Sequence, residues 1–122
     1  MLNNLYKIES QTMSDQWVTT SVKLDANHAI FRGHFPGQPV LPGVCMLEMI
    51  SEIMGSLLEK NIRISAAPLV KFLRMIDPRK NPDINVEINY QETGPGFAAS
   101  GKIFSGPEIF MKFQLTLLAD PV

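Results

Sequence analysis

The sequence predicts an α+β domain in which one long central helix is wrapped by a curled antiparallel sheet of five or six strands. Two observations support this fold class. Residues 40–58 form one long apolar run with helical character, and the rest of the chain alternates stretches of β-branched and aromatic residues with glycine- and proline-containing turns. The 122 residues are enough for a single domain, 1–122, with a modest core. One helix and several antiparallel strands bury each other best when the sheet packs around the helix.

Two strands are expected before the helix, over residues 5–13 and 16–24. The second contains the segment WVTTSVKL, whose β-branched and aromatic residues favour extended backbone. Residues 25–42 follow as a long irregular segment. Because irregular segments of this length in compact domains usually carry function, this one is a candidate for part of a site.

The apolar run predicts a helix that begins at Pro42 and Gly43 and ends near Leu58. Proline suits the first turn, because the N–H that it lacks would have no acceptor within the helix. Apolar side chains occupy most of the circumference, so the helix is expected to be buried nearly all round. Glu48 lies in its middle, and Glu52 follows one turn later on the same face. A carboxylate in a buried helix is costly unless it is paired, protonated or open to a cavity, so these residues mark a candidate site.

Four further strands are expected after the helix, over residues 68–76, 84–92, 97–106 and 109–118. The clearest alternation is in the segment INVEINYQE, where one face would carry Ile84, Val86, Ile88 and Tyr90. Glycine and proline separate the four strands at spacings typical of an antiparallel meander.

Composition and charge exclude several classes of function. The formal net charge of −1 provides no global field that would attract nucleic acid, and Cys45, as the only cysteine, excludes an internal disulfide or a multi-cysteine zinc site. The start MLNNLYKIES lacks the features of a secretory signal, and polar residues interrupt the apolar run, so we expect a cytoplasmic protein without a membrane partner. His28 and His34 have no further histidine or cysteine nearby, so no metal or cofactor is expected, and His28 is interpreted as a hydrogen-bonding loop residue.

The segment FRGHFPGQPVLPGV, residues 31–44, holds His34 between prolines and glycines directly before the helix. His34 and the Glu48 carboxyl would suit a general base and a general acid. The free N–H groups of the first helical turn, around Gly43 and Val44, could bind a carbonyl oxygen that gains negative charge. Together these groups suit proton abstraction next to a carbonyl with loss of a neighbouring hydroxyl. A structural loop histidine and a solvated glutamate would fit the same spacing.

The segment GHFPGQPVLPGVCMLE resembles the active-site signature of 3-hydroxyacyl-(acyl carrier protein) dehydratases of the FabZ and FabA type. That signature runs Gly-His-Phe-Pro, two residues, Pro-Val, one residue, Pro-Gly-Val, three residues, Glu. Every fixed position is present: Gly33, His34, Phe35, Pro36, Pro39, Val40, Pro42, Gly43, Val44 and Glu48. The resemblance is sharp over residues 31–48.

The resemblance implies a hotdog fold and a dimer, or three such dimers together, with each site at the interface. It implies that His34 of one subunit takes the C2 proton of a 3-hydroxyacyl thioester and that Glu48 of the other protonates the departing hydroxyl. The Gly43 and Val44 backbone would polarise the thioester carbonyl, and the product would be a 2-enoyl thioester in fatty-acid or related polyketide or polyene synthesis. Residues that would shape the site are Phe35, Pro36, Pro42 and Glu52, the last standing where the family typically has glutamine.

Two other functions remain open from the sequence. Cys45 beside His34 could act as a nucleophile, which would make the protein a hotdog thioesterase, although a small packed side chain is favoured at this position. A non-catalytic acyl-binding partner subunit could also keep the motif. Basic residues around one strand and its turn fit either a solvated edge or a docking patch for an acidic acyl carrier protein; they are Lys71, Arg74, Arg79 and Lys80.

Overall fold

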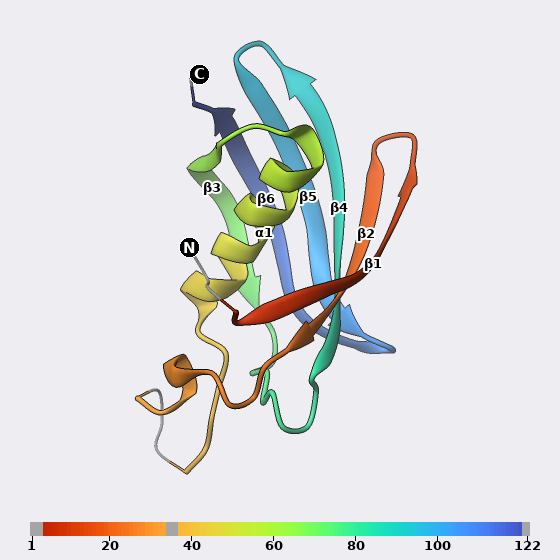
Figure 1. Ribbon diagram of the computed structural model, residues 1–122. Helices are drawn as coiled ribbons and strands as arrows, with labels where there is room; N and C mark the ends of the chain where they lie inside the picture. The colour runs from red at the N-terminus through yellow and green to blue at the C-terminus, as the bar shows by residue number, and fades with distance from the viewer. Residues whose placement is uncertain (1–3, 34–36, 121–122) are drawn as a thin grey trace.

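The computed structural model describes residues 4–33 and 37–120 as one helix packed against a six-stranded antiparallel sheet (Figure 1). The predicted α+β class is confirmed. In chain order the elements are β1 (Tyr6–Ser14), β2 (Trp17–Leu24), the short 3₁₀ helix η1 (Ala29–Phe31), α1 (Gly43–Leu58), β3 (Ile62–Phe72), β4 (Asp83–Thr93), β5 (Gly96–Ser105) and β6 (Glu108–Ala119).

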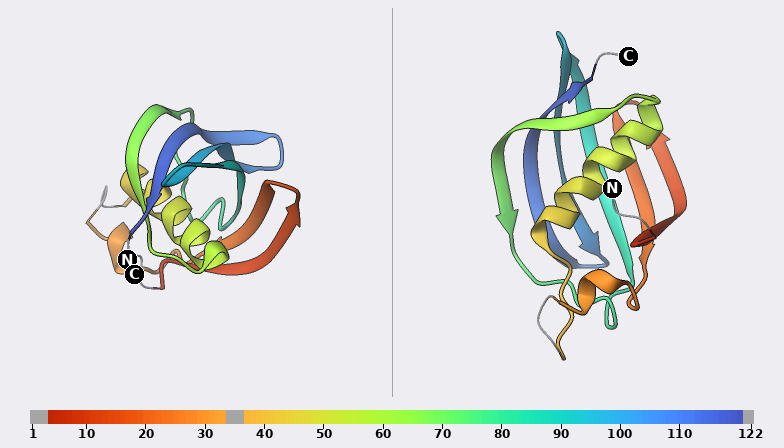
Figure 2. Two further views of the ribbon diagram at one scale, coloured as in Figure 1. Left: turned by 90° about the horizontal axis from the view of Figure 1, so that it is seen from above. Right: turned by 60° about the vertical axis from the view of Figure 1, so that its left-hand side comes forward.

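The strands lie in the order β1-β2-β4-β5-β6-β3, and the sheet curls around α1 (Figure 2). Only β4, β5 and β6 form a meander. The predicted four-stranded meander is therefore wrong for β3, which pairs with β6 at the far edge instead of with β4. The long excursion of residues 73–82 allows this change of place, because it carries the chain from one edge of the sheet back to its centre.

The bounds of β3 also differ from the prediction, which placed this strand over residues 68–76. It begins at Ile62 and ends at Phe72, and Pro68 lies inside it, where the pairing with β6 shifts register. Proline is tolerated there because β3 is an edge strand. Beyond Phe72 the chain leaves the sheet, and Ile76 becomes fully buried, with its carbonyl accepting the Leu41 N–H at 2.9 Å.

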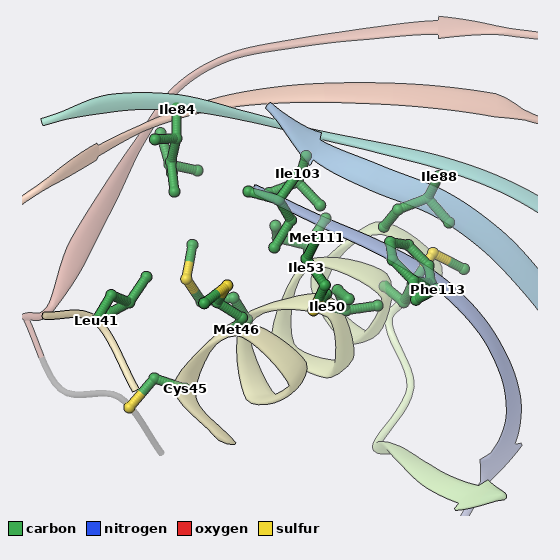
Figure 3. Close-up of a cluster of buried hydrophobic side chains, with 14 of the residues drawn as sticks. Leu41, Cys45, Met46, Ile50, Ile53, Ile84, Ile88, Ile103, Met111 and Phe113 are labelled. Atoms are coloured by element: carbon green, nitrogen blue, oxygen red, sulfur yellow. The ribbon is translucent and has the colours of Figure 1, made fainter. Parts of the chain in front are cut away.

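The hydrophobic core lies between α1 and the concave face of the sheet. Figure 3 shows Met46, Ile50 and Ile53 of the helix facing strand residues, whereas the buried Cys45 points away from them. The strand residues are Ile84, Ile88, Ile103, Met111 and Phe113, all at most 2 % exposed. The methionines of the helix, Met46, Met49 and Met54, are likewise buried, so they fill the core, as their flexible side chains allow.

One stripe of α1 is not covered by the sheet. Val44 is 74 % exposed, Glu48 and Ser56 are exposed, and Glu52 and Gly55 are half-buried. The expectation of a helix buried nearly all round is therefore wrong on this side. The reason is that the two edge strands, β1 and β3, do not meet over the helix.

The segment between β2 and α1 contains the η1 turn. His28 precedes it, and the Nδ1 atom of His28 accepts the Ile30 N–H at 3.1 Å. The interpretation of His28 as a hydrogen-bonding loop residue is confirmed. Within residues 4–33 and 37–120, no helix is long and apolar enough to cross a membrane.

Candidate active site

The N-terminus of α1 offers two backbone donors. Pro42 is the N-cap, with an extended backbone, and its carbonyl accepts the N–H groups of Cys45 and Met46 at 3.0 and 3.3 Å. The N–H groups of Gly43 and Val44 come earlier in the turn, where helix geometry provides no intrahelical acceptor. They lie at the positive end of the helix dipole, which favours a partner with negative charge.

An apolar groove of about 470 Å³ adjoins these donors. It is lined by Val40, Leu41, Pro42, Gly43, Met46, Phe72, Leu73, Arg74 and Met75. The Phe72 ring rests on the first turn, so closely that a Cβ added at Gly43 would come within 2.7 Å of Cζ. Glycine at position 43 therefore permits an aromatic wall directly beside the free N–H groups.

Glu48 lies on the uncovered stripe, one turn beyond Val44. The expectation of a buried carboxyl at this position is wrong for the single chain, because the side chain of Glu48 is exposed. Val44 and Glu48 thus share the open side of the helix, whereas Gly43 lines the apolar groove.

Glu48 and Glu52 share a cleft of about 420 Å³ between α1 and β1. The cleft is lined by Tyr6, Ile8, Glu48, Ser51, Glu52, Gly55, Ser56, Lys60, Asn61 and Ile62. The hydroxyl of Tyr6 donates to Oε1 of Glu52 at 2.8 Å. Glu52 is half-buried and faces this cleft beside Glu48.

Tyr6 is a site residue that sequence reasoning missed. It precedes Glu52 by 46 positions, and the two meet only because the start of β1 lies beside the helix. Burial is the main cause that raises the pKa of the Tyr6 phenol, and the hydrogen bond to Glu52 and the charges of Glu52 and Glu48 raise it further. Tyr6 is therefore a hydrogen-bond donor throughout the neutral pH range.

Cys45 is 3 % exposed and belongs to the cluster of buried hydrophobic residues. Burial raises the pKa of its thiol, and the charge of Glu48 adds to this effect. Because the thiolate is the nucleophilic form, a buried and protonated thiol is a poor nucleophile. This environment fits the packed side chain that was favoured for Cys45.

His34, Phe35 and Pro36 lie outside the described residues. The described chain on either side ends at Gly33 and resumes at Gly37, between η1 and α1. Among the residues from 4 to 33 and from 37 to 120, no group of three or more His, Cys, Asp and Glu side chains could hold a metal ion.

The four candidate docking residues do not form one uniform patch. Arg74 lines the apolar groove, whereas Arg79 forms an ion pair with Asp77 at 3.2 Å. The hydrogen bond from Arg79 is the main cause that lowers the pKa of Asp77. Lys80 is exposed in the same turn, and Lys71 is exposed on β3.

Lys71 is one end of a row of lysines that sequence reasoning missed. It lies directly opposite Lys112 of β6, which in turn lies opposite Lys102 of β5. Paired residues share a face of the sheet, and the neighbours Met111 and Phe113 point into the core, so the three lysines share the convex face. The alternation of apolar and polar residues along β6 could have predicted that Lys112 faces away from the core. That the three lysines stand opposite one another follows only from the strand register.

Comparisons with known proteins agree with this fold. The ApeI-like family model, described as ApeI dehydratase, matches residues 9–106. The 3-hydroxyacyl-(acyl carrier protein) dehydratase FabZ of Haemophilus influenzae strain PittEE is 30 % identical over 87 residues, which are 65 % of this chain and 59 % of that relative. The match thus spans less than two thirds of the relative's length.

Two solved structures show the same architecture. The dehydratase heterocomplex ApeI:P from Xenorhabdus doucetiae superposes with a TM-score of 0.74 at 23 % identity, covering 92 % of this chain and 96 % of that one. A candidate thioesterase from Lactococcus lactis gives 0.70 at 12 % identity, covering 99 % and 97 %. At these identities the likeness establishes the hotdog fold. The family model covers most of the sequence, and the chain belongs to the ApeI-like dehydratase family.

Proposed function

We propose that the protein dehydrates a (3R)-3-hydroxyacyl thioester carried on acyl carrier protein to the trans-2-enoyl thioester. The observation that carries this proposal is the arrangement at the start of α1. Two free N–H groups, at Gly43 and Val44, adjoin an apolar groove, and the Glu48 carboxyl follows one turn later on the open side of the helix. The segment that holds His34 leads directly into this turn.

In the proposed reaction His34 removes a proton from C2 of the substrate. The negative charge that develops on the thioester oxygen is stabilised by the N–H groups of Gly43 and Val44. Glu48 gives its proton to the C3 hydroxyl, the C3–O bond breaks, and water leaves. The electron pair of the former C2–H bond forms the double bond, so that no redox partner is required. The proton taken by His34 returns to Glu48 through solvent.

The proposal includes a homodimer with shared sites, alone or as three dimers. The helix stripe around Glu48 is uncovered, and β1 and β3 are free edges in the described chain. Large exposed apolar side chains gather near one end of β3 and the start of α1; they are Val44, Leu69, Phe72, Leu73 and Met75. Such a surface is typical of an interface. Because the similar ApeI:P structure is a dehydratase heterocomplex, a subunit of a different sequence is the alternative partner.

The carrier-docking part of the proposal rests on charge. Lys71, Lys112 and Lys102 stand opposite one another across three strands, and Glu87 of β4 follows opposite Lys102 in the same row. The acidic neighbour thus lies beside Lys102, whereas Lys71 and Lys112 face each other as like charges toward the β3 edge, which is unfavourable. Arg74 lies at the rim of the apolar groove, where an acyl chain would enter. An acidic acyl carrier protein would complement both features, and a cytoplasmic location belongs to the same proposal.

The test uses a short enoyl thioester in the hydration direction, with absorbance and free thiol followed together. A dehydratase removes the conjugated absorbance without releasing thiol. Release of thiol would instead identify a thioesterase, and the absence of both signals from a folded protein would favour the non-catalytic partner subunit.

A further inference from the structure

The contact between Tyr6 and Glu52 joins the first strand to the open face of α1. Tyr6 is the first residue of β1, and its ring packs partly buried against the hydrophobic core. Its hydroxyl reaches the Glu52 carboxylate at 2.8 Å. A hydroxyl–carboxylate bond is charge-assisted and therefore stronger than a bond between neutral groups.

The bond fixes the direction of a second carboxylate next to the proposed acid. Glu48 and Glu52 are one turn apart on the same side of α1, and they line one cleft. The other ionisable groups that line this cleft are Tyr6 on β1 and Lys60 after the helix. The Tyr6 bond restrains the Glu52 carboxylate, and a less restrained carboxylate that approached Glu48 would compete with it for a proton and for the substrate hydroxyl.

We propose that Tyr6 is a positioning residue for the dehydration, because its hydroxyl holds the Glu52 carboxylate toward β1 within the cleft that Glu52 shares with Glu48. This inference rests on the proposed function. Burial and the nearby carboxylates raise the pKa of Tyr6, so its hydroxyl stays a donor at neutral pH.

The first test detects the contact between Tyr6 and Glu52 without measuring enzyme activity. The chain has two tyrosines, so Tyr90→Phe leaves Tyr6 as the only phenol that can titrate. In that protein the phenolate absorbance should appear only at pH values well above the ordinary tyrosine range. Adding Glu52→Gln removes the adjacent charge and should move the titration to lower pH. Identical curves in the two proteins would overturn the contact.

The second test is a double-mutant cycle on kcat/KM for dehydration of a 3-hydroxyacyl thioester. Tyr6→Phe should lower kcat/KM roughly tenfold in the wild-type chain and less than twofold in the Glu52→Gln chain, because there is then no second carboxylate to hold. Tyr90→Phe is the matched control, since its ring packs edge-on against Phe97 with centroids 6.1 Å apart, and it should retain wild-type kinetics.

The outcomes separate the two levels of the proposal. Equal losses from Tyr6→Phe in both backgrounds would make Tyr6 a packing residue, and no loss in the wild-type chain would remove it from the reaction; either result overturns the inference. If the wild-type chain itself does not dehydrate the substrate, the proposed function fails, and the positioning role fails with it even where the titration supports the contact.

Discussion

Two side chains, the His34 imidazole and the Glu48 carboxyl, carry the proposed proton transfers. His34→Ala and Glu48→Gln should each lower turnover by roughly 10²–10⁴-fold, the usual contribution of a positioned acid or base. Steady-state kinetics on purified variants provide the measurement, and circular dichroism checks that both remain folded. Wild-type turnover in either variant would remove that residue from the mechanism.

The Cys45 thiol should behave as a core group and not as a nucleophile. Its raised pKa means that less thiolate is present at any given pH than for an exposed cysteine, and alkylation should stay slow until the pH rises above the ordinary thiol range of about 8.5. Cys45→Ala should therefore retain the acyl-thioester reaction. Abolished activity in a folded Cys45→Ala protein, with rapid alkylation of the wild type at neutral pH, would favour the thioesterase.

At the residue scale, helical spacing predicted correctly that Glu48 and Glu52 share a face. It did not predict that Glu48 is exposed, because apolar periodicity does not reveal which part of a helix a sheet leaves uncovered. Tyr6 was not predictable either, since its partner lies 46 positions away and the contact depends on the path of β1. The role of His34 remains a prediction from the motif.

At the scale of elements, the central strands leave no room for an added side-chain atom where their backbones lie closest together. A Cβ at Gly101 of β5 would overlap the carbonyl oxygen of Glu87 on β4 and touch the Phe113 ring. Gly101→Ala should therefore lower the free energy of unfolding by about 2 kcal/mol or more. Urea denaturation measures the loss. The control is Gly33→Ala, where no atom of residues 4–33 and 37–120 lies within 4 Å of the added atom; equal stabilities of the two variants would contradict the packing described for β5.

The strands of the sheet were predictable to different degrees. The alternation in β4 and the glycine-containing turns around β5 fixed the central strands closely. Pro68 instead predicts the start of β3, because proline usually interrupts the hydrogen bonding between strands. The strand continues through it because an edge position and a register shift accommodate the missing donor. The pairing of β3 with β6 depends on tertiary packing, which local sequence patterns do not predict.

The basic residues at the end of β3, Lys71 and Arg74, should affect only the reaction of carrier-bound substrate. Lys71→Glu combined with Arg74→Glu should raise KM for the acyl carrier protein substrate and leave a small thioester untouched, and the preference for the carrier should weaken with salt because the charges are exposed. In the matched control, Lys7→Glu and Lys23→Glu reverse the charge of two lysines that also stand opposite each other on paired strands. Equal losses on both substrates would indicate a folding or site defect.

For the whole molecule, the sequence predicted the class of fold because one apolar helix and several alternating strands have few ways to bury each other. The open stripe of α1 could not be predicted, since it depends on where β1 and β3 end around the helix. That stripe carries Glu48, so the proposed site and the proposed dimer depend on the same uncovered surface. A two-fold pairing would cover it on both subunits at once.

The most direct test of a shared acid–base site unfolds His34→Ala and Glu48→Gln subunits together and refolds them as a mixture. Random pairing makes roughly half of the dimers mixed, and in each mixed dimer one of two sites receives an intact His34 from one chain and an intact Glu48 from the other. Shared sites therefore predict recovery of roughly a quarter of the wild-type activity from two nearly inactive parents. If the mixture stays as inactive as its parents although subunit exchange is verified, the shared His34–Glu48 site is contradicted.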